Sequence, residues 1–514
     1  MKRNMAVAAL SALAVAALAL TGCSATGPAA DVGSGDVVTD GTFALALAGD
    51  PGNLDPQSSV NSGLGQMNRF LYDSLVNVLD GEIVSGLAKE WVEKENIIEF
   101  TLQPDITCAD GSALTASDIA TNINHVGDPA NLSPMAGYAI PVGATAVADD
   151  AAGTVTLSTP TVTGFLLHTL ALLPMVCGSG LDDREALGTT PAGTGPYTLT
   201  AAVPGSSYTL ERRSDYTWGP GGVGTLVAGM PKTVTVTVSA NATTTANQLL
   251  SRELNAGTVF GPDAERLESA GLASSPLTAV IGELIYNQNP GRATADPAIR
   301  MALTQALDMT ALRDVAGSGK AEASQSFTGQ NLCKSDLTDF VPKHDVKAAE
   351  SALADADLPT LRVVYLDLGA ASAAAAELVV SELGDVGVKA QASPVTFTDF
   401  STVLFQNADF DIAMFALDGT TPPSVQAFFS GPTNPNGGQN FAAIDNEKYN
   451  TLAAQAAAMP GTSGCDIWNE ADAALVSAAD AIPFASDDYP VWGANATFST
   501  FFGTVLPATI RMHG

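Results

Sequence analysis

The side chains most often used in metal and proton chemistry are sparse in this sequence of 514 residues. It contains four histidines, His125, His168, His344 and His513, and no two of them stand at the spacing of metal ligands. The His-Glu-x-x-His pattern, which places two zinc ligands and a general base on one helix face, does not occur. The sequence therefore predicts no metal site.

A glycine-rich stretch, Gly317-Ser318-Gly319-Lys320, superficially resembles a phosphate-binding loop. Ala321 stands where such a loop has the serine or threonine that holds magnesium, and the stretch follows a predicted helix rather than a strand. A solvated helix end is therefore the better interpretation. No Gly-x-Ser-x-Gly motif occurs, and scattered carboxylates cannot be paired as general acid and base from sequence alone. We predict no catalytic residue and no cofactor.

The first 22 residues have the features of an export signal. Lys2 and Arg3 form a short positive segment, and residues 5–20 are almost entirely apolar. This apolar run is shorter than the ~20 residues that a membrane-spanning helix needs. Residues 1–22 are therefore predicted to be a signal peptide.

The signal runs into Leu20-Thr21-Gly22-Cys23, which resembles a bacterial lipobox. In a lipobox the cysteine receives a diacylglyceryl group, and the signal is then cleaved in front of it. We predict that Cys23 is lipidated and that residues 23–40, which are small and polar, form a flexible tether. The alternative is a soluble secretion signal that happens to contain a cysteine.

Acidic residues outnumber basic ones by 54 to 22, which gives a net charge of −32 at pH 7. Binding to a phosphate backbone relies on clustered lysine and arginine, so nucleic acid is excluded as a partner. Anionic lipid headgroups repel such a chain, so membrane contact is expected through the N-terminal lipid only. Since no later apolar run has membrane-spanning length, the body of the protein is expected to lie outside the membrane, in an oxidising compartment.

Four cysteines remain after Cys23: Cys108, Cys177, Cys333 and Cys465. An even number of cysteines in an oxidising compartment is typical of disulfide bonds, and two bonds allow three connectivities. The four residues form no Cys-x-x-Cys pair and are widely spaced, which argues against a zinc site. Buried free thiols are the alternative.

Strand and helix patterns alternate along the chain, which indicates an α/β fold. We predict β-strands at residues 42–47, 97–102, 232–238, 361–366 and 386–390. We predict helices at residues 371–383 and 466–480, and another that begins at Asp296-Pro297, a capping residue followed by proline. Residues 361–390 thus form a strand, helix and strand, so at least one domain has a mixed sheet flanked by helices.

A series of short motifs follows in a fixed order. They are Asn53-Leu54-Asp55-Pro56, Leu71-Tyr72-Asp73-Ser74-Leu75-Val76, Asp80-Gly81, Leu87-Ala88-Lys89-Glu90-Trp91, residues 100–119, Gly193-Thr194-Gly195-Pro196-Tyr197, Arg213-Ser214-Asp215-Tyr216-Thr217-Trp218, Asp296-Pro297-Ala298-Ile299-Arg300 and Ala306-Leu307-Asp308. In this order, across residues 42–500, the chain resembles family 5 of the bacterial extracellular solute-binding proteins, the oligopeptide, dipeptide and nickel type. Some motifs also have a structural reason, since Thr115-Ala116-Ser117-Asp118 suits a capped helix start.

This resemblance implies a two-lobed, periplasmic-binding-protein-like fold of type II, whose lobes close around a ligand. It assigns residues 41–71, 179–270 and 482–514 to lobe I, residues 72–178 to a subdomain inserted in lobe I, and residues 271–481 to lobe II. On that division Cys108 pairs with Cys177 and Cys333 with Cys465, because the other connectivities would bridge parts that move relative to each other.

The resemblance also implies ligand contacts. In peptide-binding members, the segment that follows the counterpart of Asp409-Phe410-Asp411-Ile412 carries an aromatic residue and an aspartate that binds the peptide amino terminus. Here Thr420 stands where that aspartate is expected, and Asp418 precedes it by two residues. This departure argues against simple peptide recognition. Leu417, Asp418 and Thr420 are the candidate contacts in this segment, and the alternative for Asp418 is to cap the turn before Gly419.

Three further candidates come from the other parts of the expected cleft. Asn61 and Ser62 resemble the wall of lobe I that meets an extended ligand, and Asp487 stands where peptide binders have a pocket tyrosine. The alternative for each is a polar side chain that faces solvent. If Asp418 and Asp487 both face the cleft, they favour a cationic or amine-bearing ligand, because a desolvated carboxylate needs a partner.

The function that the resemblance implies is that of a receptor anchored by lipid to the outer face of the cell membrane. Such a receptor binds a peptide or similar small solute and delivers it to the permease of an ABC importer. It performs no catalysis, and we expect a monomer. Two alternatives stay open: a secreted hydrolase of α/β type, and a receptor that signals the presence of its ligand without transport.

Overall fold

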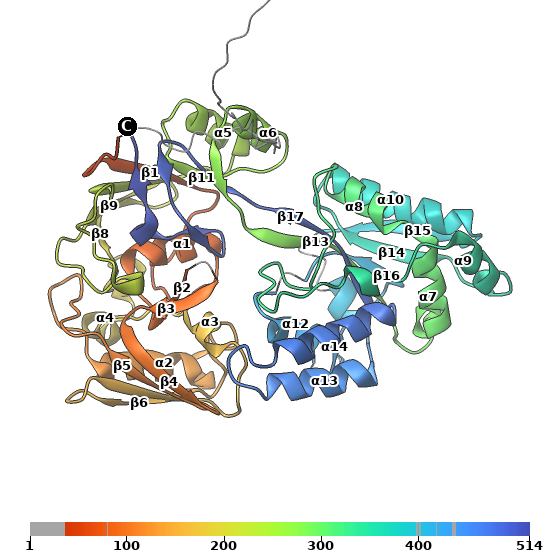
Figure 1. Cartoon of the computed structure of the whole chain (residues 1–514), viewed down its shortest axis with the longest axis horizontal. Coiled ribbons are helices and arrows are strands. Elements are labelled where there is room, and N and C mark those ends of the chain that lie inside the picture. The colour runs from red at the N-terminus through yellow and green to blue at the C-terminus, as the bar shows by residue number, and fades with distance from the viewer. Residues whose placement is uncertain (1–35, 80, 397–398, 400–401, 418, 434–437) are drawn as a thin grey trace, which may run out of the picture.

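The computed structural model describes residues 36–514, with the exception of residues 80, 397–398, 400–401, 418 and 434–437. The predicted signal peptide, Cys23 and Asp418 therefore lie outside the described residues. The described chain forms two lobes that are joined by a pair of long strands (Figure 1). None of the helices in the described ranges combines the length and the hydrophobicity that a membrane-spanning segment needs.

Lobe I is built on a seven-stranded sheet with the order β12-β18-β11-β1-β10-β9-β8. Its strands are β1 (Thr42–Leu47), β8 (Tyr197–Val203), β9 (Ser207–Arg212), β10 (Thr233–Val238), β11 (Ala256–Thr258), β12 (Ala273–Ser275) and β18 (Val491–Gly493). Val234 and Val236 of β10 are fully buried, whereas the intervening Thr235 is partly exposed, as period-two alternation predicts. The predicted strands at 42–47 and 232–238 are therefore confirmed, and they pair with each other in parallel.

Short elements complete lobe I around this sheet. Its helices are α1 (Ser62–Leu71), α5 (Ala242–Leu250) and α6 (Pro262–Ser269), and its two small antiparallel ladders are β19 (Ala496–Thr497) with β22 (Arg511–Met512) and β20 (Thr500–Phe501) with β21 (Thr504–Val505). The N–H of Val38 donates to the carbonyl oxygen of Met512 at 3.0 Å, and Asp40 forms an ion pair with Arg212. The last residues of the predicted tether, 36–40, thus already contact the folded body.

The inserted subdomain has its own sheet and core below lobe I in Figure 1. The sheet has the order β4-β5-β7-β6 and consists of β4 (Ala88–Lys94), β5 (Ile97–Leu102), β6 (Thr145–Asp149) and β7 (Thr154–Ser158). The subdomain also contains a separate hairpin of β2 (Val76–Leu79) and β3 (Glu82–Ser85). Its helices are α2 (Ala116–Gly127), α3 (Leu166–Leu170) and α4 (Gly178–Asp182). A capping box between Thr115 and Asp118 begins α2, and Ile119 and Ile123 bury its apolar face. The expected helix start at Thr115 is confirmed.

Lobe II contains a five-stranded sheet with the order β15-β14-β16-β13-β17. Its strands are β13 (Thr278–Tyr286), β14 (Leu361–Leu366), β15 (Ala390–Val395), β16 (Ile412–Met414) and β17 (Ala481–Asp488). Its helices are α7 (Pro297–Ala306), α8 (Met309–Ala316), α9 (Val346–Leu353), α10 (Ala370–Asp385), α12 (Pro422–Phe429), α13 (Glu447–Ala457) and α14 (Cys465–Ser477). Asp296 caps α7 as predicted, because its side chain accepts a hydrogen bond from the N–H of Ala298 at 2.8 Å.

The predicted strand, helix and strand are present as β14, α10 and β15, with β14 parallel to β15. The prediction of a strand at 386–390 was wrong in its position, because the strand begins only at Ala390. Gly387 adopts a positive φ of 83° and donates its N–H to the carbonyl oxygen of Gly384. This tight turn ends α10, so the chain becomes extended only after it.

The two long strands between the lobes are β13 and β17 (Figure 1). They pair antiparallel from Thr278 opposite Asp488 to Ile285 opposite Ala481, with a register shift on both sides of Gly282. A Cβ atom at Gly282 would lie 2.4 Å from the ring of Phe484. The irregularity in the ladder therefore depends on a residue without a side chain.

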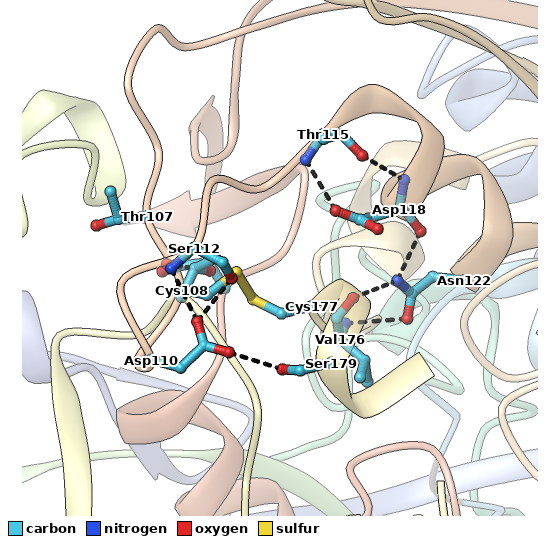
Figure 2. The surroundings of a disulfide bond; sticks show 12 residues. Thr107, Cys108, Asp110, Ser112, Thr115, Asp118, Asn122, Val176, Cys177 and Ser179 are labelled. Atoms are coloured by element: carbon cyan, nitrogen blue, oxygen red, sulfur yellow. Dashed lines mark hydrogen bonds between the residues drawn. A yellow bond between two sulfur atoms is a disulfide. The ribbon is translucent and has the colours of Figure 1, made fainter. Parts of the chain in front are cut away.

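The described cysteines form two pairs at disulfide distance, Cys108 with Cys177 and Cys333 with Cys465. Figure 2 shows Cys108 in the loop after β5 and Cys177 at the start of α4. The carboxylate of Asp110 accepts hydrogen bonds from the hydroxyl groups of Ser112 and Ser179 at 2.6 and 2.9 Å, which holds the two segments side by side. These are the pairs that the resemblance implied, and the covalent bonds stay a prediction.

Candidate ligand-binding site

Helix α1 lies on the side of lobe I that faces lobe II. Asn61 caps the helix, since its side-chain oxygen accepts a hydrogen bond from the N–H of Leu64 at 2.8 Å. Leu64, Met67 and Phe70, spaced three residues apart, are fully buried in the core of lobe I. The face left uncovered by this packing carries Ser62, Gly65 and Arg69 toward a cavity.

This cavity has a volume of about 340 Å³, which is at the small end of the usual range for ligand pockets. It is lined by residues from widely separated parts of the chain: several between Pro56 and Asn77, the subdomain residues Met135, Tyr138, Leu172 and Pro174, then Pro196, Tyr216, Pro220, Leu277 and Thr420, and several between Phe502 and Ala508. Thr420 follows β16 of lobe II and Leu277 precedes β13. The cavity thus lies on lobe I at its border with lobe II.

Most of the lining is apolar or aromatic. Tyr138, Leu172, Leu277 and Phe502 contribute to it, together with several prolines. Polar groups come chiefly from α1 and the segment before it. This composition, an apolar container with a small number of oriented polar groups, is typical of sites for small organic ligands.

One lining carboxylate, Asp73, is satisfied by neighbouring side chains. It accepts hydrogen bonds from the hydroxyl of Tyr216 at 2.8 Å, the hydroxyl of Thr194 at 2.9 Å and the indole N–H of Trp218 at 3.1 Å. Burial raises the pKa of Asp73, and these donors together with Arg213 act in the opposite direction. Three of the sequence motifs therefore meet at Asp73, where they join α1 and β2 to the rest of lobe I.

The lining cation is Arg69. Its Nη1 donates to the carbonyl oxygen of Ala171 at 3.1 Å, and its Nε donates to the hydroxyl of Thr504 at 3.3 Å. Its guanidinium carbon lies 5.0 Å from the centre of the Phe501 ring. Desolvation by burial lowers the pKa of Arg69 to about 10, so the group still carries its charge at neutral pH.

Three of the six predicted ligand contacts, Asn61, Ser62 and Thr420, line the cavity. The structure therefore brings together positions from lobe I and lobe II that are more than 350 residues apart in sequence. Their contact with a ligand stays a prediction.

Two of the other predicted contacts, Leu417 and Asp487, are not among the residues that line the cavity. Leu417 is buried, and its N–H donates to the carboxylate of Glu283 on β13 at 3.2 Å. Asp487 lies on β17, where its carboxylate accepts a hydrogen bond from the N–H of Asp488 at 2.8 Å. Asp418 lies outside the described residues. The charged groups of the described lining therefore do not support the hypothesis of a cationic ligand.

Three lining residues were not predicted from the sequence: Arg69, Tyr138 and Phe502. For Arg69 a signal existed, because residues 62, 65 and 69 share one face of a helix at its period of 3.6 residues. Tyr138 and Phe502 lie in irregular segments, so no periodic pattern marks them as lining residues.

The family model for "Bacterial extracellular solute-binding proteins, family 5 Middle" matches residues 82–440. Among curated proteins, the periplasmic murein peptide-binding protein MppA of Escherichia coli is 36% identical over 118 residues, which is 22% of each chain. The glutathione-binding protein GsiB of Pectobacterium atrosepticum is 26% identical over 285 residues, which is 53% of each chain. The chain thus spans from about a fifth to about half of the length of these relatives.

Solved structures match over nearly the whole chain. A substrate-binding protein from Microbacterium hydrocarbonoxydans, solved with 4-hydroxybenzoate hydrazide, is 27% identical with a TM-score of 0.69 and covers 92% of this chain and 99% of its own. CtaP from Listeria monocytogenes is 19% identical with a TM-score of 0.78, covers 92% of this chain and 100% of its own, and supports the fold alone. Since the family model covers well over half of the sequence and the two-lobed fold agrees with it, this protein belongs to family 5 of the bacterial extracellular solute-binding proteins.

Proposed function

We propose that this protein binds a peptide or similar small solute between its two lobes and delivers it to an ABC-type permease. The observation that carries the proposal is the position of the cavity. It opens on lobe I next to Thr420 of lobe II, beside the strands β13 and β17 that join the lobes. Rotation about two crossing strands would bring lobe II over the cavity and enclose a ligand, which is the hinge closure known in binding proteins.

The peptide class rests on the relatives. MppA is named a murein peptide-binding protein, and the Agrobacterium fabrum protein YejA, 31% identical over 198 residues, is named a probable peptide-binding protein. The lining adds support, because the amide side chains of Asn61 and Asn68 and the hydroxyl of Ser62 lie along one side of an otherwise apolar cavity. Amide and hydroxyl groups pair with the N–H and C=O groups that a peptide backbone offers.

We further propose that the protein is a monomer held by a lipid on Cys23 at the outer face of the cell membrane, with no role for nucleic acid. The sequence around Cys23 supports the lipid anchor, and the net charge of −32 argues against nucleic acid as a partner. Metabolic labelling with palmitate tests the anchor: we expect label on the wild-type protein and none on Cys23→Ser, which should appear in the culture medium. Label that persists on the Cys23→Ser variant would contradict the assignment.

Calorimetry with a panel of short peptides tests the binding function. We expect at least one peptide to bind, and Phe502→Ala to weaken that binding because Phe502 lines the cavity. Phe340→Ala, which removes an exposed ring outside the lining, is the matched control and should leave affinity unchanged. Hydrolysis of a peptide by the purified protein would favour the hydrolase alternative instead.

Delivery to a permease is tested in cells. A strain that lacks this protein should lose uptake of the bound peptide, and expression of the wild-type chain should restore it. Uptake that continues unchanged in the deletion strain would favour a receptor that senses its ligand without transport.

A further inference from the structure

Arg69 differs from most other arginines of the described chain because no carboxylate of the described residues lies within 4.0 Å of it. Ion pairs with aspartate are formed by Arg184, Arg212, Arg213, Arg266, Arg292, Arg300, Arg313 and Arg362. The chain has 54 acidic and only 22 basic residues, so carboxylate partners are abundant. Among the described arginines, Arg252 and Arg511 also lack such a partner, but of these three only Arg69 lines the cavity.

The surroundings of Arg69 hold the guanidinium in place without neutralising it. A carbonyl oxygen, a hydroxyl group and an aromatic ring contact it, and none of the three carries a net charge. These contacts engage two of the five N–H groups that an arginine offers. Donor capacity and a full positive charge therefore remain at the cavity wall.

The nearest acid in the sequence does not supply the missing charge. Asp73 also lines the cavity, but its carboxylate receives hydrogen bonds from three other side chains, Thr194, Tyr216 and Trp218, and forms no ion pair with Arg69 within 4.0 Å. Its position is fixed by that cluster. No acid in the part of the chain that the structure describes pairs with Arg69, so its charge is open to an anionic group of a ligand.

We propose that the solute bound by this protein carries a carboxylate, and that this carboxylate pairs with Arg69. The inference rests on the proposed solute-binding function and narrows its ligand class. A guanidinium accepts a carboxylate through two parallel N–H to oxygen bonds, which orients the ligand as well as holding it. The rings of Tyr138 and Phe502 line the same cavity, so an apolar part of the ligand would lie beside the carboxylate.

The carboxylate can be the C-terminus of a peptide or the acid group of a small organic acid, and matched probes separate the two sources. We would measure binding by calorimetry of tripeptides built from alanine and phenylalanine as free acids and as C-terminal amides, and of benzoate against benzamide. For the source that is correct, we expect the acid to bind at least about tenfold more tightly than its amide, the effect of one lost charge-assisted pair.

Variants then assign that preference to Arg69. Arg69→Gln should reduce the ratio of acid affinity to amide affinity to about one while the affinity for the amide stays unchanged. Arg69→Lys should retain part of the preference for the acid, because lysine keeps the charge but cannot form two parallel hydrogen bonds to a carboxylate. Arg252→Gln is the control, since Arg252 is exposed, bonds to Asn495 and does not line the cavity. Thermal unfolding of each ligand-free variant shows that the fold is retained, and if Arg69→Gln fails to fold, Arg69→Lys alone decides.

The possible failures are distinguishable. If acids and amides bind the wild-type protein equally well, or if Arg69→Gln keeps the preference for acids, the inference is overturned while the binding function stands. If no probe of either kind binds, the proposed peptide class fails and this inference fails with it.

Discussion

The backbone N–H of Phe165 donates a hydrogen bond to the carbonyl oxygen of Gly461 at 2.9 Å, and this bond links the inserted subdomain directly to lobe II. The loop between α13 and α14 reaches toward α3 at this point (Figure 1). The side chain of Phe165 is 1% exposed and belongs to the same apolar cluster as Val425 and Phe429 of lobe II. The lobes are therefore in contact at a second place, away from β13 and β17.

We expect Phe165→Ala to shift the protein toward a more open arrangement of its lobes. Removing a buried phenylalanine side chain typically costs about 3–5 kcal/mol, and here part of that loss falls on the contact between the lobes. Small-angle X-ray scattering of the ligand-free protein should show a larger radius of gyration for Phe165→Ala than for wild type. Phe340→Ala, at an exposed ring of lobe II, is the control. Identical scattering curves for Phe165→Ala and wild type would contradict the prediction.

A second prediction concerns Asp472, which is buried on helix α14. Burial raises the pKa of Asp472 from 3.8 to about 8. The unfolded chain loses this proton near pH 3.8, whereas the folded chain keeps it until about pH 8, so the folded state binds more protons in between. Asp472 thus lowers the free energy of unfolding as pH rises through this window, by up to about 1.4 kcal/mol per pH unit.

Asp472→Asn removes this titration and should raise Tm at pH 8 by several degrees more than at pH 5. Differential scanning calorimetry at both values measures the difference. Glu470→Gln changes an exposed acid on the same helix and should shift Tm little at either pH. An equal effect of Asp472→Asn at pH 5 and pH 8 would show that its carboxyl group titrates normally in the folded protein.

Gly282 is predicted to be indispensable to the ladder between β13 and β17. A methyl group there would meet the buried ring of Phe484, so Gly282→Ala should lower the free energy of unfolding by about 1–3 kcal/mol in chemical denaturation. Phe484→Leu in the same chain should relieve part of the loss. Gly384→Ala is the matched control, because nothing lies within 4 Å of its Cβ position and alanine favours helix α10. Equal stability of the two alanine variants would contradict this account.

The cysteine pairing is tested by peptide mapping under non-reducing conditions. We expect fragments that join Cys108 to Cys177 and Cys333 to Cys465, and no fragment that crosses between these pairs. Cys177→Ser should lower the free energy of unfolding by about 2–4 kcal/mol, because the bond restricts the unfolded chain. Recovery of alkylated free thiols at all four positions would instead support the buried-thiol alternative.

Local signals predicted much of the fold. The alternation in β10, the capping residue and proline at Asp296-Pro297 and the capping box at Thr115 are decided within a few neighbouring residues, and all three are present in the structure. The strand after α10 begins later than predicted because Gly387 adopts a tight turn, which hydrophobicity alone does not reveal. Boundaries of this kind depend on backbone conformation rather than on pattern.

The site was harder to predict, because its lining comes from segments far apart in sequence. Asn61 and Ser62 were found through resemblance, and Thr420 through its departure from the family pattern. Phe502 reaches the cavity only because the C-terminal ladder of β20 and β21 packs beside α1. Arg69 lacks an acidic partner in the described fold, a property that no single stretch of sequence can display.

The junction of residues 36–40 with the C-terminal strand has a consequence for the lipid proposed on Cys23. The N–H of Gly514 donates to the carbonyl oxygen of Asp36 at 3.0 Å, so the chain enters lobe I beside its other end. About a dozen residues separate Asp36 from Cys23, and they reach at most ~45 Å. With the proposed lipid on Cys23, lobe I would be the half of the molecule held near the membrane, and lobe II would be the half that moves in the proposed closure.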